Sequence, residues 1–119
     1  MMVMSTTPLA ARRCVPCEAG TPPLAADQWH PLLEQLHGWE VQDGVRLAKE
    51  YRFKDFLGAV DFVNRITPIA EAEGHHPDLQ VGWGRVLVEL TTHAAGGLTE
   101  NDFVLAAKID RDAAPGRPD

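Results

Sequence analysis

The chain has 119 residues, and its 11 Lys and Arg against 17 Asp and Glu give a formal net charge of −6. This length predicts one domain with a modest hydrophobic core. The negative charge argues against binding to nucleic-acid phosphates, and no apolar run reaches the roughly 20 residues that a membrane-spanning helix needs. Met1–Ala10 lacks a basic segment followed by an apolar core, so we expect a cytoplasmic protein without a signal peptide.

Residues 1–23 are small, polar or proline, without periodicity, and they predict a flexible N-terminal arm. Cys14 and Cys17 form a single Cys-x-x-Cys within this arm. One such pair supplies only two of the four ligands of a zinc site, and a thioredoxin-like redox motif would instead follow a strand. The favoured interpretation is that the two cysteines have no chemical role, although such a role stays open.

The first periodic segment predicts a helix. Four apolar side chains recur at the helical spacing i, i+3, i+4 and i+7: Trp29, Leu32, Leu33 and Leu36. Asp27 is the expected N-cap, and Gly38 is the expected stop. Pro31 fits this helix only in the first turn, because an interior proline removes a backbone hydrogen bond.

A β-hairpin is expected next in the chain. Residues 39–42 and 46–53 alternate between apolar and polar side chains, which is the period of a half-buried strand. Asp43-Gly44 lies between these two segments and is a strong two-residue turn.

From Lys54 the apolar period becomes that of a long helix. Its predicted stripe consists of Phe56, Ala59, Val60, Val63, Ile66 and Ala70. Pro68 should kink this helix or end its regular hydrogen bonding early, and Gly74 is a natural stop. Glu71 and Glu73 stand at the end where the helix dipole disfavours carboxylates, so they are either solvated or functional.

A second hairpin is expected after this helix. Apolar side chains alternate from 79 to 83, and a turn is predicted near Gly84-Arg85. The returning strand has one apolar face, made of Val86, Val88 and Leu90. His93 has the opposite parity, so we expect it to point to the more polar surface.

A loop is predicted at residues 94–97, followed by a third helix. Thr99 is its expected N-cap, with Asp102 three residues on as an approximate capping box. The helix should run to about Asp110, and residues 113–119 predict a disordered tail.

The complete pattern predicts the order α-β-β-α-β-β-α, with one domain spanning residues 24–112. Two hairpins make a four-stranded antiparallel sheet, and the helices pack on one of its faces, which defines an α+β fold. The other face is open and partly apolar, which suggests a partner or a site there.

Three histidines are the candidate functional groups: His75, His76 and His93. Adjacent residues of extended chain point in opposite directions, so the His75-His76 pair is poorly placed to share a metal, and we predict no metal site. Imidazole has an ordinary pKa of about 6.5 and suits acid–base catalysis near neutral pH. Structural interpretations stay open, in which the His-His-Pro segment only ends a helix and Asp102 only caps one.

These residue types and their spacing resemble the signature of the pterin-4a-carbinolamine dehydratases, also called 4a-hydroxytetrahydrobiopterin dehydratases. The pattern reads Glu71-x3-His75-His76-Pro77-x5-Trp83-x9-His93-x8-Asp102. The resemblance covers about residues 24–110 and includes the flanking segments Gly38-Trp39, Thr91–His93 and Gly97–Phe103.

The resemblance implies an enzyme that removes water from a 4a-hydroxytetrahydropterin to give the quinonoid dihydropterin. Such an enzyme recycles the pterin cofactor of aromatic amino acid hydroxylases and needs no metal or organic cofactor of its own. The implied partners are the pterin substrate and further copies of the chain, in a homodimer or homotetramer, and not nucleic acid or a membrane. The alternative is a non-catalytic pterin-related accessory protein, or a dimerisation or binding module, on the same fold.

The resemblance also implies roles for individual residues. His75, His76 and His93 form the catalytic set, in which His75 and His93 exchange protons and His76 mainly orients the pterin. The implied substrate-binding residues are Glu71, His75, His76, Pro77, Trp83, Thr92, His93, Ala94, Ala95 and Asp102.

Overall fold

The computed structural model describes residues 7–16 and 20–114 of the chain. Within these residues the predicted order α-β-β-α-β-β-α is confirmed. The elements are α1 (Ala26–Leu33), β1 (Glu40–Gln42), β2 (Arg46–Arg52), α2 (Phe56–Glu73), β3 (Asp78–Gly82), β4 (Arg85–Leu90) and α3 (Glu100–Asp112), with short 3-10 helices η1 (Leu9–Ala11) and η2 (His93–Ala95).

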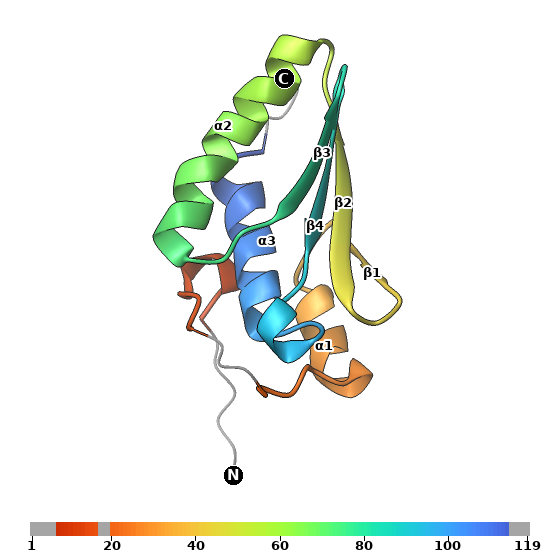
Figure 1. Ribbon diagram of the computed structural model, residues 1–119, viewed down its shortest axis with the longest axis vertical. Coiled ribbons are helices and arrows are strands. Elements are labelled where there is room, and N and C mark those ends of the chain that lie inside the picture. The colour runs from red at the N-terminus through yellow and green to blue at the C-terminus, as the bar shows by residue number, and fades with distance from the viewer. Residues whose placement is uncertain (1–6, 17–19, 115–119) are drawn as a thin grey trace.

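The four strands form one antiparallel sheet with the spatial order β1-β2-β4-β3. β2 and β4 pair in the centre, from Leu47 opposite Leu90 to Arg52 opposite Arg85. β1 and β3 are therefore the edge strands, and α2 and α3 pack on one face of the sheet (Figure 1). The predicted α+β class is confirmed.

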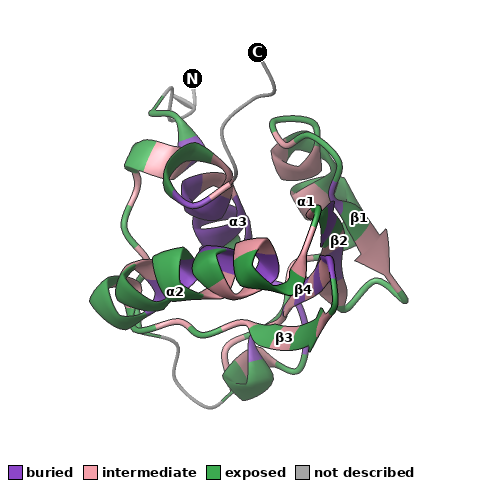
Figure 2. Cartoon of the chain, turned by 90° about the horizontal axis from the view of Figure 1, so that it is seen from above, coloured by how far each residue is buried: buried purple, intermediate pink, exposed green. Residues whose placement is uncertain are grey.

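The hydrophobic core lies between the sheet and α3. Leu47, Val86 and Val88 of the central strands are fully buried, and burial of such a side chain contributes about 1.5–3 kcal/mol. α3 is the most buried of the helices (Figure 2). Because its N-terminal turn is buried with the rest, the groups on that turn are held in fixed positions.

α2 begins where its sequence predicts, and three residues of its predicted stripe, Ala59, Ile66 and Ala70, are buried. Asp55 is the N-cap, and its side chain accepts a hydrogen bond of 2.8 Å from the backbone N–H of Gly58. Phe62, which the predicted stripe omits, is fully buried, whereas Phe56 is 52% exposed. The buried stripe consists of Ala59, Phe62, Ile66 and Ala70.

The predicted start of α1 is wrong by two residues. Its N-cap is Ala25 and not Asp27, because the side chain of Gln28 accepts a 2.7 Å hydrogen bond from the Ala25 backbone N–H. Pro31 therefore lies in the interior of the helix instead of in its first turn. No residue of α1 is fully buried, so this helix has the weakest packing of the three.

Of the two effects expected of Pro68, an early end of α2 is not observed. The helix continues to Glu73 and ends at Gly74, which has the left-handed φ of 64°. A proline at this position removes a single intrahelical hydrogen bond. Burial of Ile66 and Ala70 on either side of it offsets that loss.

The described part of the predicted flexible arm packs against the domain. We call residues 7–16 the strap. Its η1 turn buries Leu9 to 3% exposure, and Lys108 Nζ and Arg111 Nη1 each donate a 2.9 Å hydrogen bond to the carbonyl of Ala10. These contacts join residues about a hundred positions apart, which local sequence patterns do not encode. Cys17 lies outside the described residues.

The predicted C-terminal tail also begins too early. Ala113 follows α3 and is fully buried, and its backbone N–H donates a 2.8 Å hydrogen bond to the carbonyl of Ile109. The remainder of the predicted tail, from residue 115, lies outside the described residues.

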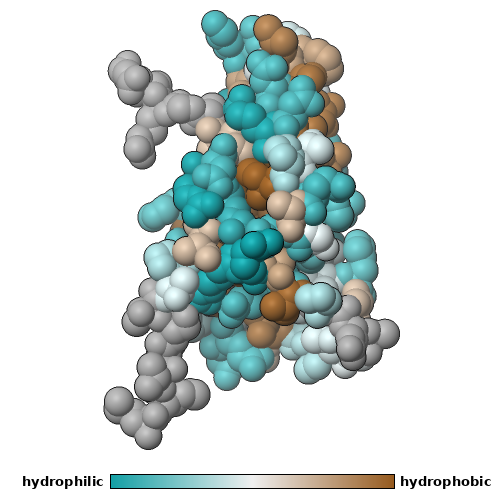
Figure 3. Space-filling view, turned by 90° about the vertical axis from the view of Figure 1, so that its left-hand side faces the viewer, coloured by the Kyte–Doolittle hydropathy of each residue, from teal (hydrophilic) through white to brown (hydrophobic). Residues whose placement is uncertain are grey.

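The side on which α2 lies in Figure 1 is mostly hydrophilic, and brown surface is most frequent toward the end where α2 begins (Figure 3). This distribution is typical of a helix with one face in the core and the other in water. In the part of the chain that the structure describes, no helix combines the length and the apolar character needed to cross a bilayer.

Candidate active site

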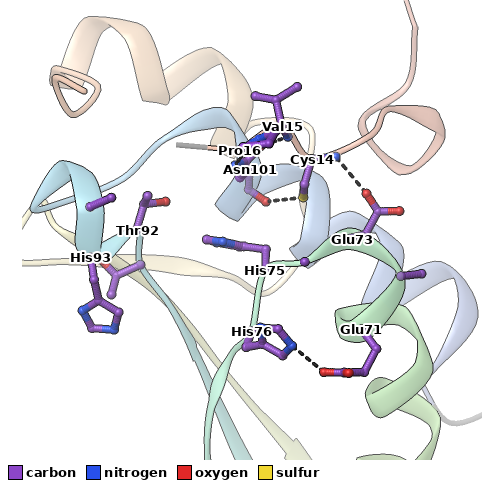
Figure 4. A pocket seen from close by; sticks show the side chains of 14 residues that line it. Cys14, Val15, Pro16, Glu71, Glu73, His75, His76, Thr92, His93 and Asn101 are labelled. Carbon is purple, nitrogen blue, oxygen red and sulfur yellow. Dashed lines mark hydrogen bonds and ion pairs between the residues drawn. The ribbon is translucent and has the colours of Figure 1, made fainter. Parts of the chain in front are cut away.

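A cavity of about 550 Å³ lies where four parts of the chain meet (Figure 4). These parts are the C-terminal end of α2 with the residues that follow it, the junction of β4 with η2, the first turn of α3, and the strap. The lining residues are Cys14, Val15, Pro16, Glu71, Ala72, Glu73, Gly74, His75, His76, Thr91, Thr92, His93, Ala94 and Asn101. All three predicted catalytic histidines therefore line one cavity.

His75 reaches this cavity because α2 ends abruptly. Gly74 adopts the left-handed conformation that glycine favours at a helix end, with φ of 64°. The next residue leaves the helix axis, and its imidazole projects toward Thr92 at the far end of β4 (Figure 4). The side chain of His75 is only 12% exposed.

The imidazole of His75 pairs with Asp102, which is fully buried at the third position of α3. His75 Nε2 lies 2.6 Å from Asp102 Oδ1. Asp102 Oδ2 accepts two further hydrogen bonds of 2.9 Å, one from the backbone N–H of Thr99 and one from the hydroxyl of Thr92. The carboxylate therefore has three donors and also lies at the positive end of a helix dipole.

This arrangement fixes the tautomer of the His75 ring. An ionised carboxylate only accepts hydrogen bonds, so Nε2 must carry the proton that Asp102 Oδ1 receives. Nδ1 is then the ring nitrogen of His75 that can take a proton from a ligand. The sequence suggested that Asp102 caps α3; the structure shows that the same carboxylate also orients His75.

His76 and Glu71 form a second pair at the rim of the cavity. His76 Nε2 lies 2.6 Å from Glu71 Oε2, and the two side chains are 58% and 69% exposed. Figure 4 shows the His76 ring turned toward the helix that carries Glu71. His75 pairs with Asp102 and His76 pairs with Glu71, so the two neighbouring side chains point in opposite directions, as expected.

His93 lies on the opposite wall and does not belong to a strand. β4 ends at Leu90, and His93 opens the 3-10 helix η2. The direction of its side chain is therefore set by η2, and the prediction that His93 belongs to the strand is wrong, although its side chain is exposed as expected. His93 is exposed, which suits a group that exchanges protons with solvent.

Glu73 is one of the two carboxylates at the C-terminal end of α2, where the helix dipole disfavours negative charge, and its contacts explain its position. Its side chain is 6% exposed and turned to the strap, where Oε1 accepts a 2.8 Å hydrogen bond from the Cys14 backbone N–H. Burial acts to raise the pKa of Glu73. The Cys14 hydrogen bond and the charges of Lys108 and Arg13 outweigh it, so this pKa is lower than usual.

Some predicted substrate-binding residues do not line the cavity. Pro77, Ala95 and Asp102 lie outside its lining, and Asp102 can act only through its partners. Trp83 is 73% exposed in the Trp83-Gly84 turn between β3 and β4, one residue earlier than the predicted turn. The five residues of β3, about 17 Å long at about 3.3 Å per residue, lie between Trp83 and the histidine end of the sheet.

Sequence reasoning missed the lining residues of the strap and Asn101. The amide of Asn101 contacts the backbone of Val15, 86 residues away. No local pattern signals such a pair. The proline-rich composition of the arm instead suggested disorder.

A comparison with protein families matches residues 22–111 to the model of the pterin 4 alpha carbinolamine dehydratases. The chain belongs to this family. A relative from Rubrobacter xylanophilus, provisionally named as a pterin-4-alpha-carbinolamine dehydratase, is 50% identical over 103 residues. The match covers 87% of this chain and 96% of the relative's chain. One from Methylococcus capsulatus is 45% identical over 112 residues, covering 93% of this chain and 98% of its own.

Solved structures of pterin dehydratase type share this fold. The crystal structure of a "transcriptional coactivator/pterin dehydratase" from Brucella melitensis has a TM-score of 0.72 and 33% identity, covering 77% of this chain and 99% of its own. A pterin dehydratase-like RuBisCO assembly factor of the alpha-carboxysome has a TM-score of 0.54 at 22% identity, which shows a shared fold alone. Across residues 7–16 and 20–114, no three His, Cys, Asp or Glu side chains are grouped to hold a metal.

Proposed function

We propose that this member of the pterin dehydratase family removes water from a 4a-hydroxytetrahydropterin to give the quinonoid dihydropterin. The observation that carries the proposal is the pair of His75 and Asp102, in a cavity that His76 and His93 also line. This reaction recycles the pterin that aromatic amino acid hydroxylases release.

The proposed reaction needs an acid and a base on one small ring system. The bond from C4a to its hydroxyl oxygen breaks while an acid protonates the departing oxygen. A base takes the proton from the neighbouring ring nitrogen, and the electrons of that N–H bond form the new C=N bond. Each positioned proton transfer typically contributes about 10²–10⁴-fold in rate.

The geometry favours His75 as the base and His93 as the acid. Asp102 holds the Nε2 proton of His75, so the lone pair of Nδ1 is available to the ring N–H. His93 is exposed on the other wall and can be recharged with protons from water. His76, paired with Glu71, then orients the pterin at the rim.

The direct test is turnover of 4a-hydroxytetrahydropterin in a stopped-flow spectrophotometer, with the parent chain, His75→Ala and His93→Ala. Each variant should lose about 10²–10⁴-fold in kcat and stay folded. His93→Ala should keep the parental unfolding temperature, whereas His75→Ala should unfold several degrees lower, because the buried Asp102 loses a hydrogen-bond partner. His37→Ala is the matched control, because this exposed histidine lies outside the cavity lining. Parental turnover in both cavity variants would overturn the assignment, and an inactive parent would favour the non-catalytic alternative.

We also propose that the chain forms a homo-oligomer. Large apolar side chains are exposed on the edge strand β3, on its turn and at the start of α2: Val81, Trp83, Phe56 and Leu57. Monomeric proteins seldom leave such residues together in water. Sedimentation equilibrium should give two or four times the 13.1 kDa mass of the chain, and a 13 kDa species at micromolar concentration would exclude the proposal.

A further inference from the structure

The strap contributes a wall of the cavity although it lies outside the family domain. The family match begins at residue 22, whereas Cys14, Val15 and Pro16 line the same cavity as the histidines. The family model therefore does not include the part of the cavity wall that the strap supplies.

The side-chain amide of Asn101 binds both backbone polar groups of Val15 in the strap. Its Oδ1 accepts a 2.9 Å hydrogen bond from the backbone N–H of Val15, and its Nδ2 donates one of 2.6 Å to the Val15 carbonyl. Asn101 is 5% exposed and directly precedes Asp102 in α3. The position of Val15 is thus tied to the element that orients His75.

A second contact anchors Cys14, the residue before Val15, to the C-terminal end of α2. Glu73 lies two residues before His75, and its Oε1 accepts a 2.8 Å hydrogen bond from the backbone N–H of Cys14. Arg13 Nε lies 3.2 Å and Lys108 Nζ 3.6 Å from Glu73 Oε2. The strap therefore spans the ends of α2 and α3 that deliver the His75–Asp102 pair.

The anchored segment presents an apolar surface to the cavity. Its backbone N–H groups at positions 14 and 15 are directed to Glu73 and Asn101. Val15 is nevertheless 64% exposed while it lines the cavity. An apolar side chain that is held in place and left open to a cavity gains free energy when a flat ring covers it.

We propose that the strap is a substrate-contact wall, in which Val15 and Pro16 pack against the pterin and Asn101 is the positioning residue that holds them. This inference rests on the proposed function and extends it to residues outside the family domain. The wall acts on binding and not on proton transfer, because the side chains of Val15, Pro16 and Asn101 carry no group that titrates.

The first test compares Val15→Ala and Asn101→Ala in the full-length chain. Calorimetric titration with 7,8-dihydropterin, a stable analogue of the ring, should give a Kd raised about three- to tenfold for Val15→Ala, which removes two methyl groups' worth of contact. Asn101→Ala should raise Kd and KM at least as much, with kcat within about twofold of the parent. A purely structural role for the strap would lower the unfolding temperature without this split between KM and kcat.

Arg111→Ala is the matched control. Its guanidinium holds the carbonyl of Ala10 in the same strap, but it does not line the cavity. Kd and KM should stay at the parental values in this variant. Parental Kd in both Val15→Ala and Asn101→Ala would overturn the inference.

The second test uses Cys14, the other lining residue of this segment, as a probe. Cys17→Ser leaves one cysteine in the chain, since the sequence contains two. Alkylation of Cys14 by iodoacetamide, followed by mass spectrometry, should slow at least fivefold when 7,8-dihydropterin is bound. An unchanged rate at saturating pterin would show that the ligand does not lie against the strap and would overturn the inference.

These tests separate the two proposals. A parent chain that binds dihydropterin with protection of Cys14, but does not dehydrate the substrate, would overturn the reaction and support the wall. A parent with full turnover and unaltered variants would overturn the wall alone. A parent that binds no pterin would overturn both.

Discussion

His75 and Asp102 are 27 residues apart in the sequence, and their side chains meet at 2.6 Å in the wall of the cavity. The carboxylate is fully buried, whereas the imidazole is 12% exposed. A buried, fully hydrogen-bonded acceptor behind a partly open imidazole is an arrangement that fixes the tautomer and direction of a catalytic base.

The variant Asp102→Asn tests whether Asp102 orients the His75 ring, separately from any contact with the substrate. The amide keeps the shape of the side chain, but it can donate a hydrogen bond to Nε2 and so favours the other tautomer of His75. We expect kcat to fall by about 10² or more, and the free energy of unfolding to fall by about 1–3 kcal/mol, since buried donors lose a charged acceptor. Stopped-flow turnover and urea unfolding measure the two effects. An Asn variant with parental kcat would mean that Asp102 only caps α3.

Glu73 should make the stability of the protein sensitive to acid. Its pKa in the folded chain is lower than the ordinary value of 4.5. A group of this kind contributes stability above its unfolded-state pKa and loses it as the pH falls toward the folded value. The difference in unfolding free energy between the parent and Glu73→Gln should be constant from pH 7 to about pH 5, and should shrink below about pH 4.5. Urea unfolding at half-unit pH steps checks this, and a difference that grows on acidification would contradict it.

Tyr51 should not ionise while the protein is folded. Burial raises its pKa, and so do the hydrogen bond to Asp110 and the negative charge of that carboxylate. Because the chain contains a single tyrosine, absorbance at 295 nm reports on this residue alone. Phenolate absorbance should be absent near pH 10, the ordinary pKa, and should appear only together with unfolding. Since the raised pKa holds the neutral form, stability is complete below pH 10 and falls as the pH rises above it.

Gly84 should tolerate substitution far less than its neighbour Gly82. Gly84 has φ of 66°, and an added Cβ would lie 2.8 Å from the backbone carbonyl oxygen of Phe53. Gly82 has open space at the same position. Gly84→Ala should therefore lower the free energy of unfolding by about 1–3 kcal/mol, whereas Gly82→Ala should leave it unchanged or raise it by up to about 1 kcal/mol. Urea unfolding of both variants provides the comparison, and equal losses would contradict the turn geometry.

Oligomer formation offers a separate check on the exposed apolar residues. Trp83→Ser and Leu57→Ser place polar side chains at two of these positions, which are 73% and 68% exposed. We expect the double variant to shift the sedimentation equilibrium toward the monomer, because it removes apolar surface that an interface would bury. An unchanged mass would place the interface elsewhere.

The order of the elements was predictable from the sequence, because helices and strands follow from apolar spacing within a few residues. The sequence also located the end of α2 at Gly74, the N-cap at Thr99 and the three histidines as candidates, since these are local signals or a family pattern. Four features emerged only from the folded chain: Asp102 orients His75, η2 directs His93, Trp83 lies far from the cavity, and the strap is docked. Each of these depends on groups that packing brings together from distant parts of the chain, and no local period records such contacts.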